Sequence, residues 1–168
     1  MYLKSCYDHI AHVPATLACQ SLRMPPEPLH SFFSTLQEIS YQTQTAYGKS
    51  QLTFGGKEPG FSNKPQGSGQ GNGAASQIWT VVSTKMFKML HSLGLANFIY
   101  SPIDGMELVL VGFAYVDDSD LFAFTTTDSI EQMATKMQTI IDSWQKAAKV
   151  TGGAIAPAKC WWYIFNNG

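Results

Sequence analysis

Two adjacent aspartates, Asp117 and Asp118, separate two apolar runs in the C-terminal half of the chain. The runs before and after them, residues 106–115 and 120–126, are rich in the β-branched and aromatic residues that strands favour. Because few residues separate the runs, the pattern predicts a buried strand and a second strand joined as a β-hairpin, with both aspartates at its tip. Neighbouring carboxylates at a tight tip repel each other unless something neutralises them.

A divalent cation is the best neutralising partner for such a pair of carboxylates. Mg²⁺ prefers oxygen ligands and usually binds one or two carboxylates together with substrate phosphates. Two such ions can hold the attacking and leaving oxygens of a phosphoryl displacement, so the tip is a candidate site for nucleotide transfer. The alternative is a polar turn that holds two aspartates only because Asp favours turns.

Helices with one apolar face surround the hairpin in the sequence. Spacings of three and four residues between apolar positions predict four helices: about residues 10–22, about residues 29–45, from after residue 73 to Gly94, and from Asp128 to the glycines at 152 and 153. In the last of these, Glu131 follows Asp128 by three residues, which predicts a capping box.

Strand signals and composition complete the expected fold. Residues 46–54 predict a short strand pair that turns at Gly48, and residues 154–168 predict one last strand. The order of elements predicts an α+β fold, in which helices pack on one face of a small antiparallel sheet. With 168 residues, of which 45% are hydrophobic, the chain is long enough for one globular domain with a real core.

Charge and cysteine content limit the class of function. The formal net charge is −1, and Arg23 is the single arginine, so a simple phosphate-binding protein with bidentate arginine clamps is disfavoured. Three cysteines, an odd number, are typical of a reducing compartment. The chain has no long apolar run and begins without an apolar signal core, so we expect a soluble protein, cytoplasmic or nuclear, that does not enter membranes.

A loop rich in glycine, proline, serine and asparagine covers residues 55–73. It is too long for a plain connection, and because a helix is expected directly after it, a phosphate or template contact and a flexible linker both stay open. Near the start of the chain, His9 and His12 lie close to Cys6, but irregular spacing and the lack of a fourth ligand favour surface histidines over a zinc site. Residues 161–165 are largely aromatic and are expected to form strand and core, or an exposed patch.

The ordered motifs of the chain resemble those of the reverse transcriptase family. Tyr115-Val116-Asp117-Asp118 matches the Y-x-D-D core of the family's palm subdomain, and the segment GQGNG before the third helix is similar to its glutamine-glycine motif. Gln70-Gly71-Asn72 fits that motif best, and Gln66 with Gly67 is a second candidate. Residues 151–162 resemble the segment in which a glycine, apolar residues and a lysine precede the last palm strand. Residues 3–10, LKSCYDHI, resemble the end of the family's first aspartate motif.

This resemblance, which extends from Lys4 to Trp162, implies a partial reverse transcriptase palm of ferredoxin-like fold over residues 1–168, with the fingers and thumb absent. It implies RNA-directed DNA polymerisation with Mg²⁺ or Mn²⁺, on an RNA or DNA template-primer and with deoxynucleoside triphosphates. The residue roles that it implies are metal ligation and catalysis by Asp117 and Asp118, template and nucleotide contact by Gln70, Gly71, Asn72 and Tyr115, a sugar gate at Tyr7, and protonation of pyrophosphate by Lys159.

One position departs from the family. The family's first motif has a metal-bridging aspartate six residues before the position of Asp8, and that position is Tyr2 here. A phenol is neutral at pH 7 and does not replace a carboxylate. Asp8 is no substitute, because six extended residues span about 20 Å. Two alternatives therefore stay open: a catalytically inactive retroelement remnant, and an unrelated α+β module that binds a divalent metal at the hairpin tip.

Overall fold

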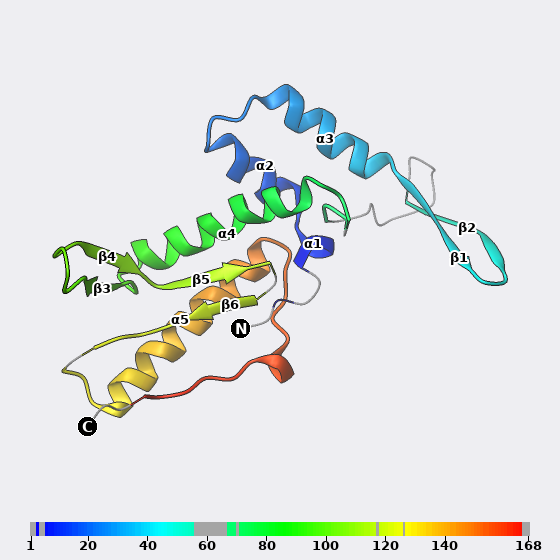
Figure 1. The fold of residues 1–168 in the computed structure, drawn as a ribbon. Helices are drawn as coiled ribbons and strands as arrows, with labels where there is room; N and C mark the ends of the chain where they lie inside the picture. The colour runs from blue at the N-terminus through cyan, green and yellow to red at the C-terminus, as the bar shows by residue number, and fades with distance from the viewer. Residues whose placement is uncertain are drawn as a thin grey trace.

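The computed structural model describes residues 3, 6–55, 67–69, 71–116, 118–125 and 127–165. The helices are α1 (Cys6–His9), α2 (His12–Gln20), α3 (Pro26–Glu38), α4 (Ala75–Ser92), α5 (Ile130–Val150) and the 3₁₀ turn η1 (Pro157–Lys159). The strands are β1 (Ser40–Thr45), β2 (Gly48–Gly55), β3 (Asn97–Tyr100), β4 (Glu107–Leu110), β5 (Gly112–Tyr115) and β6 (Asp118–Leu121). Figure 1 shows their arrangement.

The mixture of helices and small antiparallel sheets confirms the predicted α+β class. In the described part of the chain, however, the strands form three separate hairpins, β1–β2, β3–β4 and β5–β6, instead of one sheet. The β1–β2 hairpin extends away from the helices beyond the end of α3 (Figure 1). Near the middle of the molecule, Leu3 makes a single antiparallel bridge with Ile155.

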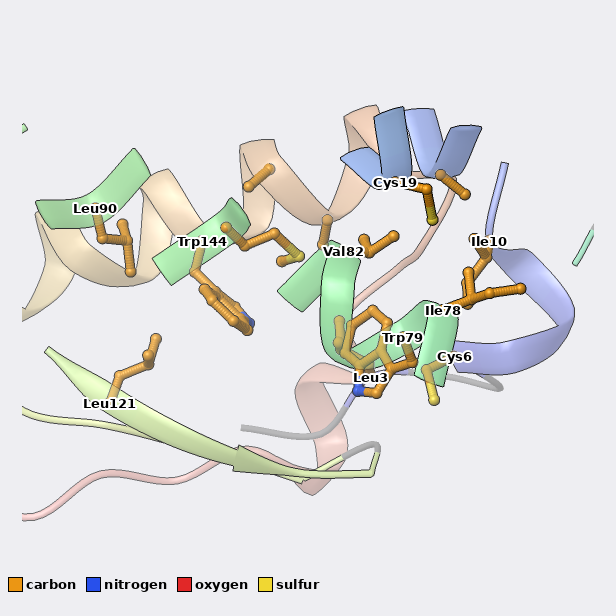
Figure 2. Close-up of a cluster of buried hydrophobic side chains, with 14 of the residues drawn as sticks. Leu3, Cys6, Ile10, Cys19, Ile78, Trp79, Val82, Leu90, Leu121 and Trp144 are labelled. Carbon is orange, nitrogen blue, oxygen red and sulfur yellow. The ribbon is translucent and has the colours of Figure 1, made fainter. Parts of the chain in front are cut away.

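Helices α4 and α5 cover one face of the β5–β6 hairpin. Along β6, Ser119 and Leu121 are buried while Asp118 and Asp120 are exposed, as expected for a strand with one covered face. Leu121 lies opposite Trp144 of α5 in the core (Figure 2). The helices therefore pack on one face of this hairpin, and its other face carries the polar residues of the candidate site.

The core is centred on α4, which packs between α2 and α5. Trp144 is completely buried, and its ring lies 4.7 Å from the ring of Phe87, at an angle of 40°. The other fully buried large side chains of the core are Leu3, Ile10, Cys19, Val82, Leu90 and Ile140. None of the helices in the described ranges has both the length and the apolar character needed to cross a bilayer.

Helix α3 is shorter than predicted and β1 begins earlier. The helix ends at Glu38, and Ile39 has extended backbone angles, φ −63° and ψ 131°. Strand β1 then pairs residues 40–45 with β2 around a turn at Ala46 and Tyr47, so the predicted extension of the helix to residue 45 is wrong. The apolar helical spacing stops at Ile39, and the threonines and Tyr41 that follow favour extended backbone.

The apolar run of residues 106–115 forms two strands instead of one buried strand. β4 pairs with β3, a strand that the sequence pattern did not reveal, and β5 pairs with β6. The chain changes partner at Val111, and several side chains of the run are exposed, among them Leu108 and Phe113. The hairpin around the aspartates is confirmed, but its second strand begins at Asp118, two residues earlier than predicted.

Helix ends are mostly where the sequence places them. α4 ends at Ser92, next to Gly94, and α5 ends before Gly152, as predicted. The start of α5 differs by one residue, because Ser129 is the N-cap and Gln132 closes the capping box. Glu131 instead accepts a hydrogen bond from the Ser129 hydroxyl, and hydrogen bonds from its own backbone amide and from Ser129 lower the pKa of its carboxyl.

The predicted last strand is not formed by residues 154–165. Apart from the Ile155 bridge, this segment contains η1 and then a chain without regular structure. Lys159 thus ends a 3₁₀ turn and does not lie at the end of a strand. The side chains of Trp161, Tyr163 and Phe165 are exposed, so the expectation of strand and core is wrong here and the alternative, exposed aromatic residues, holds.

Candidate functional site

The β5–β6 turn is a two-residue connection. Tyr115 pairs with Asp118, so only residues 116 and 117 lie between the strands. Asp117 itself lies outside the described residues. Asp118 is exposed, and the paired Tyr115 is 81% exposed. Both lie on the face of the hairpin that the helices leave uncovered, so the outer face presents a carboxylate and a phenol next to the turn.

Val116 has a backbone conformation that β-branched residues rarely adopt. Its φ is 57°, in the left-handed region that two-residue hairpin turns require at their first position. A left-handed L-residue costs about 1–2 kcal/mol, and turns of this type normally place Asn or Gly there. The turn therefore stores strain at the position between Tyr115 and the aspartates.

Replacing Val116 with asparagine is expected to raise the free energy of unfolding by about 1 kcal/mol, because asparagine tolerates the left-handed region. Urea denaturation followed by circular dichroism measures the change. Val109 is a matched control, since it is 36% exposed against 38% for Val116 but lies in the extended strand β4. Val109→Asn should lower stability, and a loss of stability in both variants would contradict strain at Val116.

The base of the hairpin depends on Gly112. A side chain at this position would collide with the carbonyl oxygen of Asp120 and approach the side chain of Leu121 to 2.8 Å. Glycine thus lets β5 lie close to β6 just where Leu121 enters the core.

The glycine-rich loop contacts α1 through Gly67 and Ser68. The amide of Ser68 donates a hydrogen bond of 2.8 Å to the carbonyl oxygen of Tyr7, and the amide of Gly67 donates one of 3.0 Å to that of Ile10. Gly67 has a φ of +90°, and a Cβ there would lie 2.5 Å from backbone atoms of Tyr7 and Asp8. Only glycine fits this contact, in which the loop touches the predicted sugar gate through its backbone.

The residues predicted for the glutamine-glycine motif, unlike Gly67 and Ser68, have no described contact with α1. Gln70 and the alternative Gln66 are both outside the described residues. Gly71 is exposed, with open space where a side chain would extend. Asn72 accepts a hydrogen bond of 3.0 Å from the amide of Ala74, which forms a turn directly before α4. The described contacts to Tyr7 therefore come from Gly67 and Ser68, next to the alternative glutamine, and the role of residues 70–72 stays a prediction.

The other described residues that the sequence predicts for the site, Tyr7 and Lys159, lie in α1 and η1. Tyr7 is half-buried in α1 and packs against the core. Both figures place the β5–β6 turn toward the end of α4 that faces α1. The 3₁₀ turn η1, which ends with Lys159, follows the bridge between Ile155 and Leu3. Tyr2, the departure from the first motif, lies outside the described residues.

The described residues contain no ready metal centre. They hold no group of three or more His, Cys, Asp or Glu side chains that could bind an ion together, and Cys6, His9 and His12 form no such group. Because a magnesium site needs only one or two carboxylates plus substrate oxygens, Asp118 with Asp117 remains a chemically suitable pair. Burial raises the pKa of the Cys19 thiol, which makes this core cysteine a poor nucleophile.

A small hollow lies behind this region, lined by residues that include Leu3, Ile10, Trp79 and Thr151. Its volume of about 10 Å³ is enough for one water molecule at most and far below that of a ligand pocket. The Nε1 of Trp79 is buried and has no hydrogen-bond partner among the described atoms. This hollow is therefore too small to hold a substrate.

Sequence reasoning missed His12 as part of this region. Its Nε2 lies 2.7 Å from the carbonyl oxygen of Gly67, and its Nδ1 lies 3.1 Å from Nε2 of Gln37. The prediction of a surface histidine is wrong for His12, which is half-buried between α3 and the loop. No local pattern could have revealed this contact, because the bonded residues are 55 positions apart.

Comparison with known proteins adds no relative, because no protein-family model matches the chain and no curated protein or solved structure is significantly similar to it.

Proposed function

We propose that this chain is a reverse-transcriptase-like palm domain that binds Mg²⁺ or Mn²⁺ at the β5–β6 turn and a nucleotide or template strand beside it. The observation that supports the proposal is the hairpin itself. Asp118 pairs with Tyr115 next to a strained two-residue turn, on the uncovered face, and this arrangement is compatible with the Y-x-D-D resemblance. Strain of this kind is most often kept at functional sites.

The arrangement suits binding of phosphates through a cation better than direct binding. The chain has one arginine and a net charge of −1, so a metal ion is the strongest positive charge that could hold a triphosphate at this surface. Asp118 and Asp117 would hold the ion, and Lys159 at the end of η1 would face the departing pyrophosphate. The bound ion would stabilise the charge that develops on phosphate oxygens during an in-line displacement.

The tyrosine at position 2 is evidence against catalysis of this reaction by the present chain. A metal-bridging carboxylate is expected at that position, and a neutral phenol cannot supply its charge. We therefore propose a palm domain that still binds a metal ion and a nucleotide or template strand but no longer catalyses polymerisation.

Primer extension by this chain is expected to be undetectable with either Mg²⁺ or Mn²⁺, because one of the metal-bridging carboxylates is missing. The assay uses an RNA template, a DNA primer and all four deoxynucleoside triphosphates. Robust primer extension that is abolished in Asp117→Ala would contradict the proposed loss of turnover. It would show that the chain is a working polymerase.

Metal binding tests the proposal without turnover. Asp118→Asn is expected to weaken Mn²⁺ binding about tenfold, because it removes one unit charge next to the ion. Electron paramagnetic resonance of free Mn²⁺ measures the dissociation constant. Asp120→Asn is the matched control, since Asp120 lies on the same exposed face of β6 but two residues further from the turn. Equal weakening by both variants would indicate diffuse attraction and no site at the turn.

A binding measurement separates the palm from an unrelated metal module. With Mn²⁺ present, a palm should bind deoxynucleoside triphosphates or a fluorescent RNA–DNA duplex, and Asp118→Asn should weaken that binding. Mn²⁺ binding at the turn without any binding of nucleotide or duplex would instead support the unrelated metal-binding module.

A further inference from the structure

His12 connects three parts of the chain that are distant in sequence. It is the first residue of α2, and its ring lies 5.0 Å from that of Phe33 in α3. Its Nε2 is 2.7 Å from the carbonyl oxygen of Gly67, and its Nδ1 is 3.1 Å from Nε2 of Gln37 near the end of α3. One imidazole thus joins α2, α3 and the glycine-rich loop.

The partners of His12 determine which ring nitrogen carries its proton. A carbonyl oxygen can only accept, so Nε2 must donate to Gly67. The Nε2 of Gln37 can only donate, so Nδ1 must be unprotonated and accept. The bond to Gly67 therefore fixes the tautomer of His12 whose proton points at the loop, and the contact of Gln37 with Nδ1 is compatible with it.

The loop residues that His12 holds are also the ones that contact Tyr7. We call Gly67 and Ser68 the strap. The strap donates backbone hydrogen bonds to Ile10 and Tyr7, and the Ser68 hydroxyl lies 3.4 Å from the same Tyr7 oxygen. Both strap residues are buried. On its other side the strap accepts the hydrogen bond from His12, so it is fixed from two directions.

We propose that His12 is a positioning residue that holds the strap against the backbone of residues 7–10 and thereby sets the distance between Tyr7 and the glycine-rich loop. An effect of this distance on the binding of a nucleotide or template strand is a further expectation, and that expectation rests on the proposed function. The positioning itself does not, since it follows from the contacts of His12 alone.

Amide hydrogen exchange in the whole chain tests the positioning. His12→Phe keeps a ring against Phe33 but removes both hydrogen bonds, whereas His12→Gln can still donate from the place of Nε2 to Gly67. In His12→Phe, the amides of Gly67 and Ser68 should exchange about tenfold faster, which corresponds to the loss of one hydrogen bond. His12→Gln should restore most of the protection.

Amides in the middle of α5, such as those of Ile140 and Trp144, serve as the internal reference and should not change. Unchanged exchange of the strap in His12→Phe would overturn the proposal. A parallel increase at the strap and in α5 would also overturn it, because it would show that His12 only stabilises the fold. Nitrogen-15 spectra should show a single Nε2-protonated tautomer of His12, and a mixture of tautomers in the unmodified chain would overturn the hydrogen bond from Nε2 to Gly67.

Nucleotide affinity tests the part that rests on the proposed function. With Mn²⁺ present, His12→Phe should weaken binding of a deoxynucleoside triphosphate by about tenfold, and His12→Gln should restore it. Unchanged affinity with a loosened strap would overturn the link to the substrate. If the unmodified chain binds no nucleotide, the proposed function fails, while the exchange result still decides whether His12 positions the strap.

Discussion

Replacing Trp144 with alanine is expected to lower the free energy of unfolding by about 4 kcal/mol. The side chain is 0% exposed and packs against Phe87 of α4, so its removal leaves a cavity between the two longest helices. The cost combines the lost transfer of the indole from water with the van der Waals attraction that the side chains around the cavity no longer have. No described hydrogen bond is lost with the indole, because the Nε1 of Trp144 has no hydrogen-bond partner among the described atoms.

Urea denaturation followed by circular dichroism at 222 nm, a standard probe of helix, measures this effect without depending on tryptophan fluorescence. Trp161→Ala is the matched control, since Trp161 is 70% exposed and its removal should change stability by less than about 0.5 kcal/mol. Trp144→Phe should cost less than Trp144→Ala, because a ring is kept against Phe87. A loss below about 1 kcal/mol in Trp144→Ala would mean that α4 and α5 do not pack as described.

Sequence patterns predicted the helices and strands that depend on interactions between residues close in the sequence. The turn residues and flanking apolar runs gave the β5–β6 hairpin, and the apolar spacing of residues 78–93 gave α4 almost to its last residue. The boundary of α3 was missed because its helical spacing ends at Ile39, while the prediction was continued to residue 45 without further apolar support. The predicted N-cap of α5, Asp128, is one residue away from the observed N-cap, Ser129. The two residues are adjacent and both are favourable N-caps, so the sequence does not separate them.

Pairing between distant segments was not predictable from one sequence. The run of residues 106–115 reads as a single strand, and only the position of β3 shows that its first half pairs elsewhere. The same holds for the final segment, whose alternation of apolar residues indicates a strand but which has no neighbouring strand to pair with beyond Ile155 among the described residues. Strand formation depends on such partners more than on propensity.

The candidate site, too, has a part that the sequence predicted and a part that it could not predict. The residues around the aspartates predicted the hairpin, because its strands and turn lie within ten residues of chain, although Asp118 begins β6 and does not lie between the strands. The contact of the strap with Tyr7 and its support from His12 and Gln37 depend on α2 and α3 folding back over the loop. Distances in sequence of 25 and 55 residues separate these partners, so they are set by packing and not by a motif.

Asn97 holds together the place where the chain changes from one hairpin to the next. It is only 3% exposed, and its amide nitrogen donates to the carbonyl oxygens of Leu110 and Phe122 at 3.1 and 2.9 Å. Its amide oxygen accepts from the backbone amide of Phe124 at 2.7 Å and from Lys136 of α5 at 3.4 Å. One buried side chain therefore connects β3, the segments next to β5 and β6, and α5.

Asn97→Leu is expected to lower the free energy of unfolding by about 3 kcal/mol, because it removes the buried amide that bonds to the backbone groups of Leu110, Phe122 and Phe124. The volume is nearly conserved, so the loss reports the hydrogen bonds and not a cavity. Asn72→Ala is the control, since this half-buried amide makes a local hydrogen bond to Ala74 and should cost only about 1 kcal/mol. Similar losses in both variants would show that Asn97 is not the link between the hairpins. A larger loss in Asn97→Leu, together with weaker Mn²⁺ binding, would instead show that the position of the turn depends on this buried amide.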